Sequence, residues 1–302
     1  MRISALTLII PTAFLAWIFG LTVIIASEPN YPQSGLLVET DWLAQHLNDP
    51  NVRIVDVRSS EQYRSRHIPN AVSGPLTEIV IRPDPSKFIT NELPSREKME
   101  SWLGSLGIGN STRVVLYDEG RSTSATRVFW TLEYYGHSGK VSILNGGLNK
   151  WQGENRQIVG NMPRVHPATY KAVNDSSKLA TKEYLLAGLR KPGVLILDAR
   201  SPKEHAGADR RATRAGHIPG AVNIDWTDNL IPGTGVFKPP EALQELYEAA
   251  GVTRDKELIV YCQSGVRASH TYFTLRLLGY TRIRIYDGSW EEWGNDPTLP
   301  IE

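Results

Sequence analysis

The chain contains an internal repeat, and this repeat limits the folds that it can adopt. The segment VRIVDVRSSEQYRSRHIPNAVSGP and the related segment VLILDARSPKEHAGADRRATRAGHIPGAVNIDW lie far apart in the sequence. Three matched pairs occur in one order at offsets of 142, 144 and 142 residues: Asp56 with Asp198, Asp118 with Cys262, and Trp151 with Trp293. A near-constant offset predicts a duplicated domain of about 120 residues, because a solenoid would show more and shorter copies.

The length of 302 residues is sufficient for two ordinary domains. We expect a first domain over residues 36–152 and a second over residues 179–302. Residues 153–178 hold several polar residues, two prolines and little periodicity, which is typical of a linker.

Within each copy, short β-branched runs alternate with helical patterns. In the second copy the runs are VLILDA, AVNI, ELIVYC and RIRIYD. The segment VRASHTYFTLRLLGY lies between the last two runs and has a helical pattern, for which Gly279 provides a C-terminal stop. Strands separated by helices predict an α/β fold in which each domain has a mainly parallel sheet flanked by helices.

The N-terminal segment, residues 1–30, predicts a location. From Ile3 to Ala26 there are 24 residues without a charge, enough to span a bilayer as a hydrophobic helix. Arg2 is the only charged side chain before them, which favours a cytoplasmic N-terminus and an exported chain on the periplasmic or extracellular face. The apolar stretch is longer than the usual core of a signal peptide, and Ile24 makes a poor cleavage site after Ala26. An uncleaved membrane anchor, a removed signal peptide and an internal hydrophobic helix all remain open.

Composition excludes some classes of function. Lys and Arg number 33 against 32 Asp and Glu, so overall charge gives no reason to expect a nucleic-acid partner. The chain has one cysteine, which excludes an intramolecular disulfide and a multi-cysteine metal site.

That cysteine, Cys262, ends the apolar run ELIVYC and is followed by QSGVRA, where a helix begins. Ligands of open α/β sheets gather at the carboxyl ends of strands. A tight loop that leads into a helix directs several backbone N–H groups at one point, and together with Arg267 these favour thiolate over thiol. Gly265 lets the loop turn. The alternative is an inert buried thiol, since cysteine is often buried, but this loop favours a nucleophile.

The loop CQSGVRA, the motifs HIPNAV and HIPGAV, and the strand ends DVR and DAR resemble the rhodanese family, which includes thiosulfate and 3-mercaptopyruvate sulfurtransferases. The resemblance covers roughly residues 36–293, and the duplicated layout resembles that of the tandem members.

The resemblance implies a mechanism. The Cys262 thiolate would attack the sulfane sulfur of thiosulfate, release sulfite and hold a persulfide. Cyanide or a thiol would then accept the sulfur, in two half-reactions with ping-pong kinetics. No metal or organic cofactor is required. The substrate-binding residues would be those of the loop: Gln263, Ser264, Gly265, Val266 and Arg267.

The loop length bears on a competing chemistry. Cysteine phosphatases place an arginine after five intervening residues, whereas here Arg267 follows Cys262 after four and Ala268 stands at the phosphatase position. The shorter loop favours sulfur transfer over phosphatase or arsenate reductase chemistry.

Two loop residues have structural alternatives. Ser264 is expected either to donate to a bound oxyanion or to cap the following helix. Arg267 is expected either to clamp a sulfonate or carboxylate or to be a solvated charge at the helix start.

Arg200 and His67 are further possible site residues, each with a structural alternative. Arg200 is four residues before Glu204, so an ion pair on a helix start would explain it. Glu204 departs from the family, whose vertebrate-type members place a substrate-binding arginine near this position; Arg210, Arg211 or Arg214 is the candidate replacement. His67, like His217, begins an HIP motif and is expected either to face an interdomain cleft or to fix a turn.

The first copy has Asp118 where the second has Cys262. A carboxylate cannot carry sulfane sulfur, so we expect this domain to be catalytically silent, with Asp118 a solvated or capping acid. Trp151 and Trp293 are expected to fill the edge of each core.

The sequence therefore predicts an exported sulfurtransferase that uses a small anionic donor, thiosulfate or 3-mercaptopyruvate. A persulfide relay to one dedicated protein shares this chemistry. The alternative of another class is a non-enzymatic rhodanese-fold module that binds a partner or senses redox state.

Overall fold

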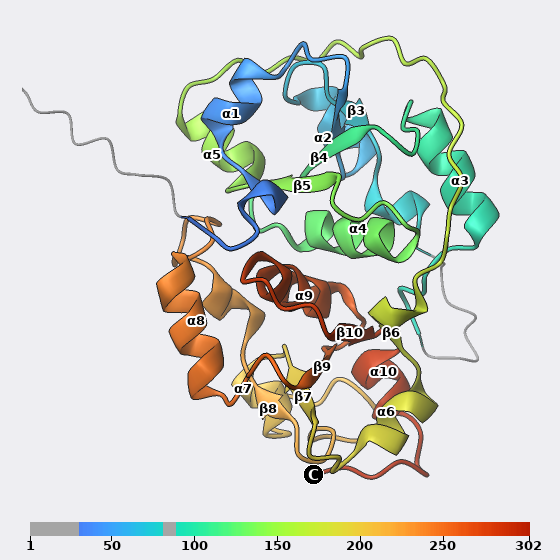
Figure 1. Cartoon of the computed structure of the whole chain (residues 1–302), viewed down its shortest axis with the longest axis vertical. Coiled ribbons are helices and arrows are strands. Elements are labelled where there is room, and N and C mark those ends of the chain that lie inside the picture. The colour runs from blue at the N-terminus through green and yellow to red at the C-terminus, as the bar shows by residue number, and fades with distance from the viewer. Residues whose placement is uncertain (1–29, 81–88) are drawn as a thin grey trace, which may run out of the picture.

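The computed structural model describes residues 30–80 and 89–302, which form two α/β domains, one above the other in Figure 1. The predicted N-terminal hydrophobic helix lies in residues 1–29, outside the described residues. Within residues 30–80 and 89–302, no helix has both the length and the apolar character needed to cross a bilayer.

The first domain is built on a five-stranded sheet of order β1-β5-β4-β2-β3 in which every pairing is parallel. Its strands are β1 (Leu37–Val38), β2 (Val52–Asp56), β3 (Val72–Ser73), β4 (Arg113–Tyr117) and β5 (Val141–Leu144). Its helices are α1 (Thr40–Gln45), α2 (Ser60–Ser65), α3 (Arg96–Ser105), α4 (Thr123–Tyr134) and α5 (Gly147–Gly153), with the 3₁₀ turns η1 (Ser34–Leu36) and η2 (Leu76–Glu78).

The second domain repeats this plan, with the parallel order β6-β10-β9-β7-β8. Its strands are β6 (Leu179–Ala180), β7 (Val194–Asp198), β8 (Val222–Asn223), β9 (Glu257–Tyr261) and β10 (Ile283–Tyr286). Its helices are α6 (Lys182–Gly188), α7 (Pro202–His205), α8 (Pro240–Ala249), α9 (Val266–Leu277) and α10 (Ser289–Trp293), with η3 (Ser176–Lys178) and η4 (Trp226–Asn229). The prediction of two duplicated α/β domains with parallel sheets is confirmed.

Local sequence explains the elements that carry the site. In β9, the four residues Leu258–Tyr261 are fully buried, as expected for a central strand with helices on both faces. Helix α9 ends at Leu277, and Gly279 follows with a φ of +83°, the left-handed conformation that glycine favours after a helix. Trp151 and Trp293 fill equivalent positions in the cores of their own domains.

Helices α4 and α9 pack side by side and join the two domains (Figure 1). One hydrophobic cluster runs through both domains, and Phe129 meets Phe273 edge to face with ring centroids 4.9 Å apart. The buried Glu133 carboxylate accepts hydrogen bonds from Tyr272 Oη at 2.7 Å and from Arg276 Nη2 at 2.9 Å. The two domains therefore share a core and a polar network.

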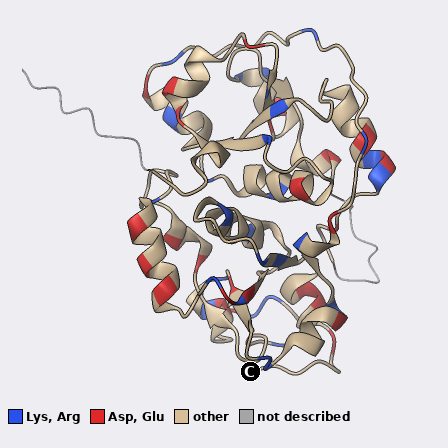
Figure 2. Ribbon diagram, in the orientation of Figure 1, with Lys and Arg blue, Asp and Glu red and all other residues tan. Residues whose placement is uncertain are grey.

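Acidic and basic residues are interspersed over both domains (Figure 2). Helix α8 carries acidic side chains along its length, with Glu241, Glu245 and Glu248 exposed. This distribution agrees with the near balance of charge in the sequence.

Candidate active site

Cys262 lies at the carboxyl end of β9, which is flanked by β10 and β7 in the middle of the second sheet. Residues 263–265 form a short loop, and α9 begins at Val266. The cysteine is 1% exposed. The strand–loop–helix arrangement predicted around Cys262 is therefore present.

The segment that follows β10 supports the start of this loop. Ser289 Oγ accepts a hydrogen bond from the Cys262 N–H at 3.2 Å. In return, the Cys262 carbonyl accepts from Trp290 N–H at 3.0 Å, and the Gln263 carbonyl accepts from Glu291 N–H at 2.9 Å. These two hydrogen bonds fix the Cys262 and Gln263 carbonyls against the start of α10 and so anchor the beginning of the loop.

Gly265 is the N-cap of α9 and has a φ of +81°. This left-handed conformation disfavours other residues, and a Cβ there would lie 2.6 Å from Asp287 Oδ1 and 2.8 Å from Arg127 Nη1. Because Gly265 and not Ser264 is the N-cap, the capping alternative for Ser264 is wrong, and the alternative of a donor to a bound oxyanion stays a prediction. Ser264 is half-buried in the loop.

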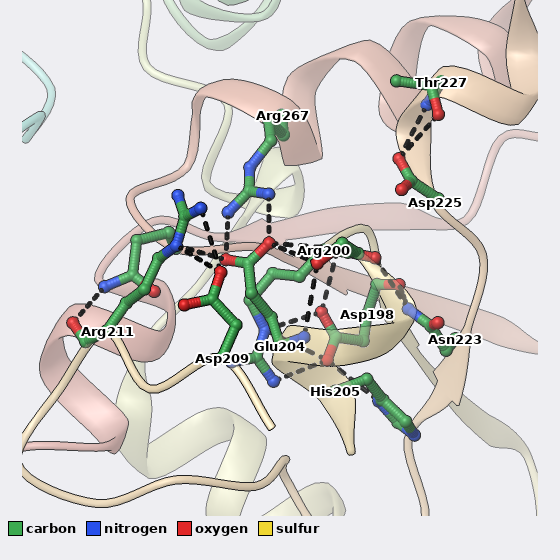
Figure 3. A network of polar contacts seen from close by, with 12 residues as sticks. Asp198, Arg200, Glu204, His205, Asp209, Arg211, Asn223, Asp225, Thr227 and Arg267 are labelled. Atoms are coloured by element: carbon green, nitrogen blue, oxygen red, sulfur yellow. Dashed lines mark hydrogen bonds and ion pairs between the residues drawn. The ribbon is translucent and has the colours of Figure 1, made fainter. Parts of the chain in front are cut away.

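Arg267, in the first turn of α9, is held by Glu204 of α7 (Figure 3). Its Nη1 and Nη2 donate to the two Glu204 carboxylate oxygens at 2.7 and 2.8 Å. Burial alone would raise the pKa of Glu204, but the hydrogen bonds and charge of Arg267 outweigh it and lower the pKa to about 2. Burial would lower the pKa of Arg267, but the hydrogen bonds and charge of Glu204 raise it.

Arg200 does not pair with Glu204, and that prediction is wrong. Its guanidinium instead binds the buried Asp198 carboxylate, with Nη2 to Oδ2 at 2.7 Å and Nε to Oδ1 at 2.9 Å (Figure 3). It also donates to the Gly216 carbonyl at 2.8 Å and lies over the Trp290 ring. Arg200 is 1% exposed, so it braces the loop between β7 and β8.

The three arginines of the α7–β8 loop have different positions. Arg211 Nε lies 3.5 Å from Glu204 Oε1, and its carbonyl accepts from Gln263 Nε2 at 3.0 Å, so Arg211 adjoins the cysteine loop. Arg214 is directed to backbone carbonyls near the C-terminus, among them Leu299 at 2.7 Å. Arg210 is exposed. Of the three, Arg211 is the one beside the site.

His67 does not face a cleft between the domains. It is fully buried, its Nδ1 lies 2.7 Å from the Tyr63 carbonyl and its Nε2 lies 3.1 Å from the Asn161 carbonyl. Its ring stacks on Tyr63. His67 therefore fixes a turn, and in the second domain His217 Nδ1 similarly lies 2.9 Å from the His205 carbonyl.

Asp118 occupies the corresponding loop of the first domain. Its Oδ1 accepts from Gly120 and Ser122 N–H at 2.9 Å, and its Oδ2 from Ser124 N–H at 3.0 Å. Burial raises the pKa of Asp118, and these hydrogen bonds oppose the increase. The residue is 7% exposed. Asp118 therefore caps α4 as expected but is not solvated.

A pocket of about 340 Å³ opens beside this first-domain loop, between apolar residues such as Leu76 and polar residues such as Arg58 and Thr123. Two of its lining residues, Arg58 and Asp118, correspond in the repeat to Arg200 and Cys262 of the second domain. With a carboxylate in place of the thiol, the pocket has no nucleophile for sulfur transfer.

Asp287, Ser289 and Arg127 touch the cysteine loop but were not predicted from the sequence. Asp287 and Ser289 directly follow β10, the strand next to β9. Because the carboxyl ends of parallel strands share one edge, this placement is a signal that identifies them. Arg127 comes from the other domain, and no sequence pattern links it to the loop. Within residues 30–80 and 89–302, no cluster of three or more His, Cys, Asp or Glu side chains is placed to hold a metal ion.

A match in each of the two domains assigns the family. Residues 39–154 and 181–296 each match the rhodanese-like domain, so the chain belongs to the rhodanese-like domain family. The two similar domains, with Cys262 in one loop and Asp118 in the other, are thus a tandem arrangement of this family's domain.

Individual relatives match nearly the whole chain. The chain is 38% identical to a sulfur carrier protein of Thermus thermophilus, over 90% of this chain and 98% of the relative. It is 34% identical to a thiosulfate sulfurtransferase of Pseudomonas aeruginosa, over 88% of this chain and 97% of the relative. Among solved structures, the 3-mercaptopyruvate sulfotransferase SseA of Escherichia coli superposes with a TM-score of 0.75 at 30% identity, over 84% of this chain and 98% of that chain.

Proposed function

We propose that the protein is a sulfurtransferase that carries sulfane sulfur on Cys262. The observation that supports this most directly is the place of the only cysteine, at the carboxyl end of a central strand and before the left-handed Gly265 turn into α9. This turn and the helix start provide backbone N–H groups and a positive dipole for a sulfur anion.

The reaction proceeds in two balanced steps. With thiosulfate as donor, the Cys262 thiolate attacks the outer sulfur, the S–S bond of thiosulfate breaks, and sulfite leaves with the electron pair. The terminal sulfur of the resulting persulfide is then attacked by cyanide or a thiolate, and the Cys262 thiolate is the leaving group. We propose that the backbone N–H groups of the loop stabilise the persulfide anion; these belong to Gln263, Ser264, Gly265 and Val266.

Thiosulfate is the proposed donor and 3-mercaptopyruvate the alternative. The sequence argument for thiosulfate was the positive charge of Arg267, but the Glu204 carboxylate already occupies both ends of its guanidinium. Support for thiosulfate now comes from relatives with that activity, such as the Pseudomonas aeruginosa enzyme. Arg211 is also paired, with Asp209 at 3.1 Å, but its side chain is 53% exposed and next to the loop, so it is the cation proposed to meet an anionic donor.

Purified full-length protein incubated with thiosulfate or 3-mercaptopyruvate should gain the mass of one sulfur atom and then form thiocyanate when cyanide is added. Cys262→Ser should abolish both results, since a serine hydroxyl cannot carry sulfane sulfur. Intact mass spectrometry and a thiocyanate assay measure the two half-reactions. A folded wild-type protein that gains no sulfur from either donor would favour the non-enzymatic binding or redox-sensing module.

We also propose that the chain is exported, as a membrane-anchored or secreted protein. The basis is the charge-free stretch from Ile3 to Ala26 after Arg2. Cell fractionation should place the protein in the membrane or the exported fraction, and the mass of its N-terminal peptide should distinguish an anchor from a cleaved signal. Recovery in the cytoplasmic soluble fraction with residues 1–26 intact would contradict export.

A further inference from the structure

The first domain reaches the cysteine loop through Arg127 of α4. The Arg127 side chain is 1% exposed and forms an ion pair across the domain boundary, with Nη1 2.5 Å and Nη2 3.2 Å from the two carboxylate oxygens of Asp287. Nη2 also donates to the Asn91 carbonyl. The planar guanidinium thus holds the Asp287 carboxylate in one orientation by two parallel contacts.

This ion pair lies directly against the loop. A Cβ at Gly265 would be 2.6 Å from Asp287 Oδ1 and 2.8 Å from Arg127 Nη1, so both partners occupy the space that a side chain at this position would need. Gly265 is the residue whose left-handed conformation turns the loop into α9. The turn at Gly265 therefore packs against the Arg127–Asp287 ion pair, in which the first domain provides the arginine.

The same segment also holds the other end of the loop. Ser289, two residues after Asp287, accepts a hydrogen bond from the Cys262 N–H through its Oγ. The Trp290 N–H donates a hydrogen bond to the Cys262 carbonyl. A displacement of Asp287 would therefore move both ends of the loop.

First-domain residues next to Arg127 fix this segment further. Leu93 N–H donates to Asp287 Oδ2 at 3.2 Å, and Thr90 Oγ1 donates to Glu291 Oε2 at 2.7 Å. Asp287 to Glu291 is thus held between the first domain on one side and the cysteine loop on the other.

We propose that Arg127 is a positioning residue for Cys262, so that the silent domain completes the active site of the other. This inference rests on the proposed function and deepens it. Arg127 touches no reacting atom and acts through Asp287 and Gly265. Without it the loop loses a support at the Gly265 turn, and an error of about 1 Å in such a site costs on the order of a hundredfold in rate.

The test compares full-length Arg127→Gln, Arg127→Lys and Asp287→Asn with wild type. The matched control is Glu133→Gln, which weakens another buried interdomain ion pair that does not contact the loop. Two rates are measured: persulfide formation from thiosulfate, by intact mass, and alkylation of Cys262 by iodoacetamide as a function of pH. Thermal unfolding of each variant reports the loss of stability separately.

We expect Arg127→Gln and Asp287→Asn to slow persulfide formation by about 10- to 100-fold. Their alkylation midpoints should move to higher pH, because fewer aligned N–H groups stabilise the thiolate. Arg127→Lys keeps the positive charge but loses the two-nitrogen guanidinium, so its rate and its alkylation midpoint should be intermediate. Glu133→Gln should lose thermal stability and keep the wild-type alkylation profile.

Wild-type alkylation profiles and loading rates in Arg127→Gln and Asp287→Asn would overturn the proposal, as would an equal shift in Glu133→Gln. If Arg127→Gln does not fold, Arg127→Lys and Asp287→Asn decide by the same criteria. If wild type forms no persulfide, the proposed function fails, and the alkylation profiles still decide whether Arg127 positions the thiol.

Discussion

At the scale of single residues, Glu204 most changes the picture of the site. It stands where the family resemblance led us to expect a substrate-binding arginine. Its two carboxylate oxygens accept hydrogen bonds from both terminal nitrogens of the Arg267 guanidinium. Arg267 is therefore kept as a fixed charge near Cys262 rather than a free clamp for the donor. Glu204 is almost fully buried, so its contribution to the stability of the fold depends on whether its carboxylate is ionised and paired with Arg267.

Stability at acid pH should depend on Glu204. Its pKa in the folded protein is about 2, below the ordinary 4.5, so it stabilises the fold fully above pH 4.5 and loses this contribution as pH falls through 4.5 toward 2. Glu204→Gln should be less stable at neutral pH, by about 1–3 kcal/mol, and should show a flatter decline across this window. Urea unfolding at a series of pH values measures both effects.

The control for this experiment is Glu245→Gln, an exposed position on α8. It should reproduce the wild-type dependence on pH. A Glu204→Gln curve parallel to wild type between pH 4.5 and 2 would show that Glu204 is not ionised with the depressed pKa.

Sequence reasoning located Cys262 between a strand and a helix but did not identify the residues around it. Cys262 was predictable because an apolar run, a glycine and an arginine follow one another in the chain. The predicted Arg200–Glu204 pair failed because Arg200 precedes the N-cap Ser201 and is not on α7, so helical spacing does not apply to it. The true partner of Glu204 lies on α9, and no local pattern reports a contact between two separate helices.

At the scale of elements, the same strand–loop–helix unit occurs in both domains, with Cys262 at the strand end in one and Asp118 in the other. In the second domain the loop runs from Cys262 to the N-cap Gly265, and in the first from Asp118 to the N-cap Ser122, one residue longer. Both N-caps have positive φ angles, +81° and +58°. Asp118 fills its loop with an internal carboxylate, so the same backbone design serves catalysis in one copy and helix capping in the other.

The elements that the sequence predicts well are those with a long pattern. The runs ELIVYC and RIRIYD became β9 and β10, and the helical segment after Cys262 became α9. Strands β1 and β6 have two residues each, too short for any periodicity to show, and they form only because an adjacent strand provides hydrogen-bond partners.

At the scale of the whole molecule, the duplicated layout was readable from the sequence, whereas the interface was not. The repeat gives two similar domains but carries no information on which faces meet. The structure joins them through α4 and α9, with a shared core and the buried Glu133 network. We therefore expect the two domains to unfold as one unit.

Glu133→Gln tests this cooperativity. The change leaves Arg276 largely buried without its counter-charge, which should cost about 3 kcal/mol and lower the midpoint of a single thermal transition by several degrees. Scanning calorimetry measures the midpoint and the number of transitions, with Glu245→Gln as an exposed control. Two separated transitions in wild type, or an unchanged midpoint in Glu133→Gln, would contradict the prediction.

The presence of a single cysteine has a consequence for the fate of the sulfur that it would carry. A protein with a second cysteine can discharge a persulfide by closing an intramolecular disulfide and releasing hydrosulfide. This chain has no such resolving thiol. Its sulfur can leave only when an acceptor enters the loop, so the supply of acceptor, and not an internal redox step, sets the lifetime of the loaded state.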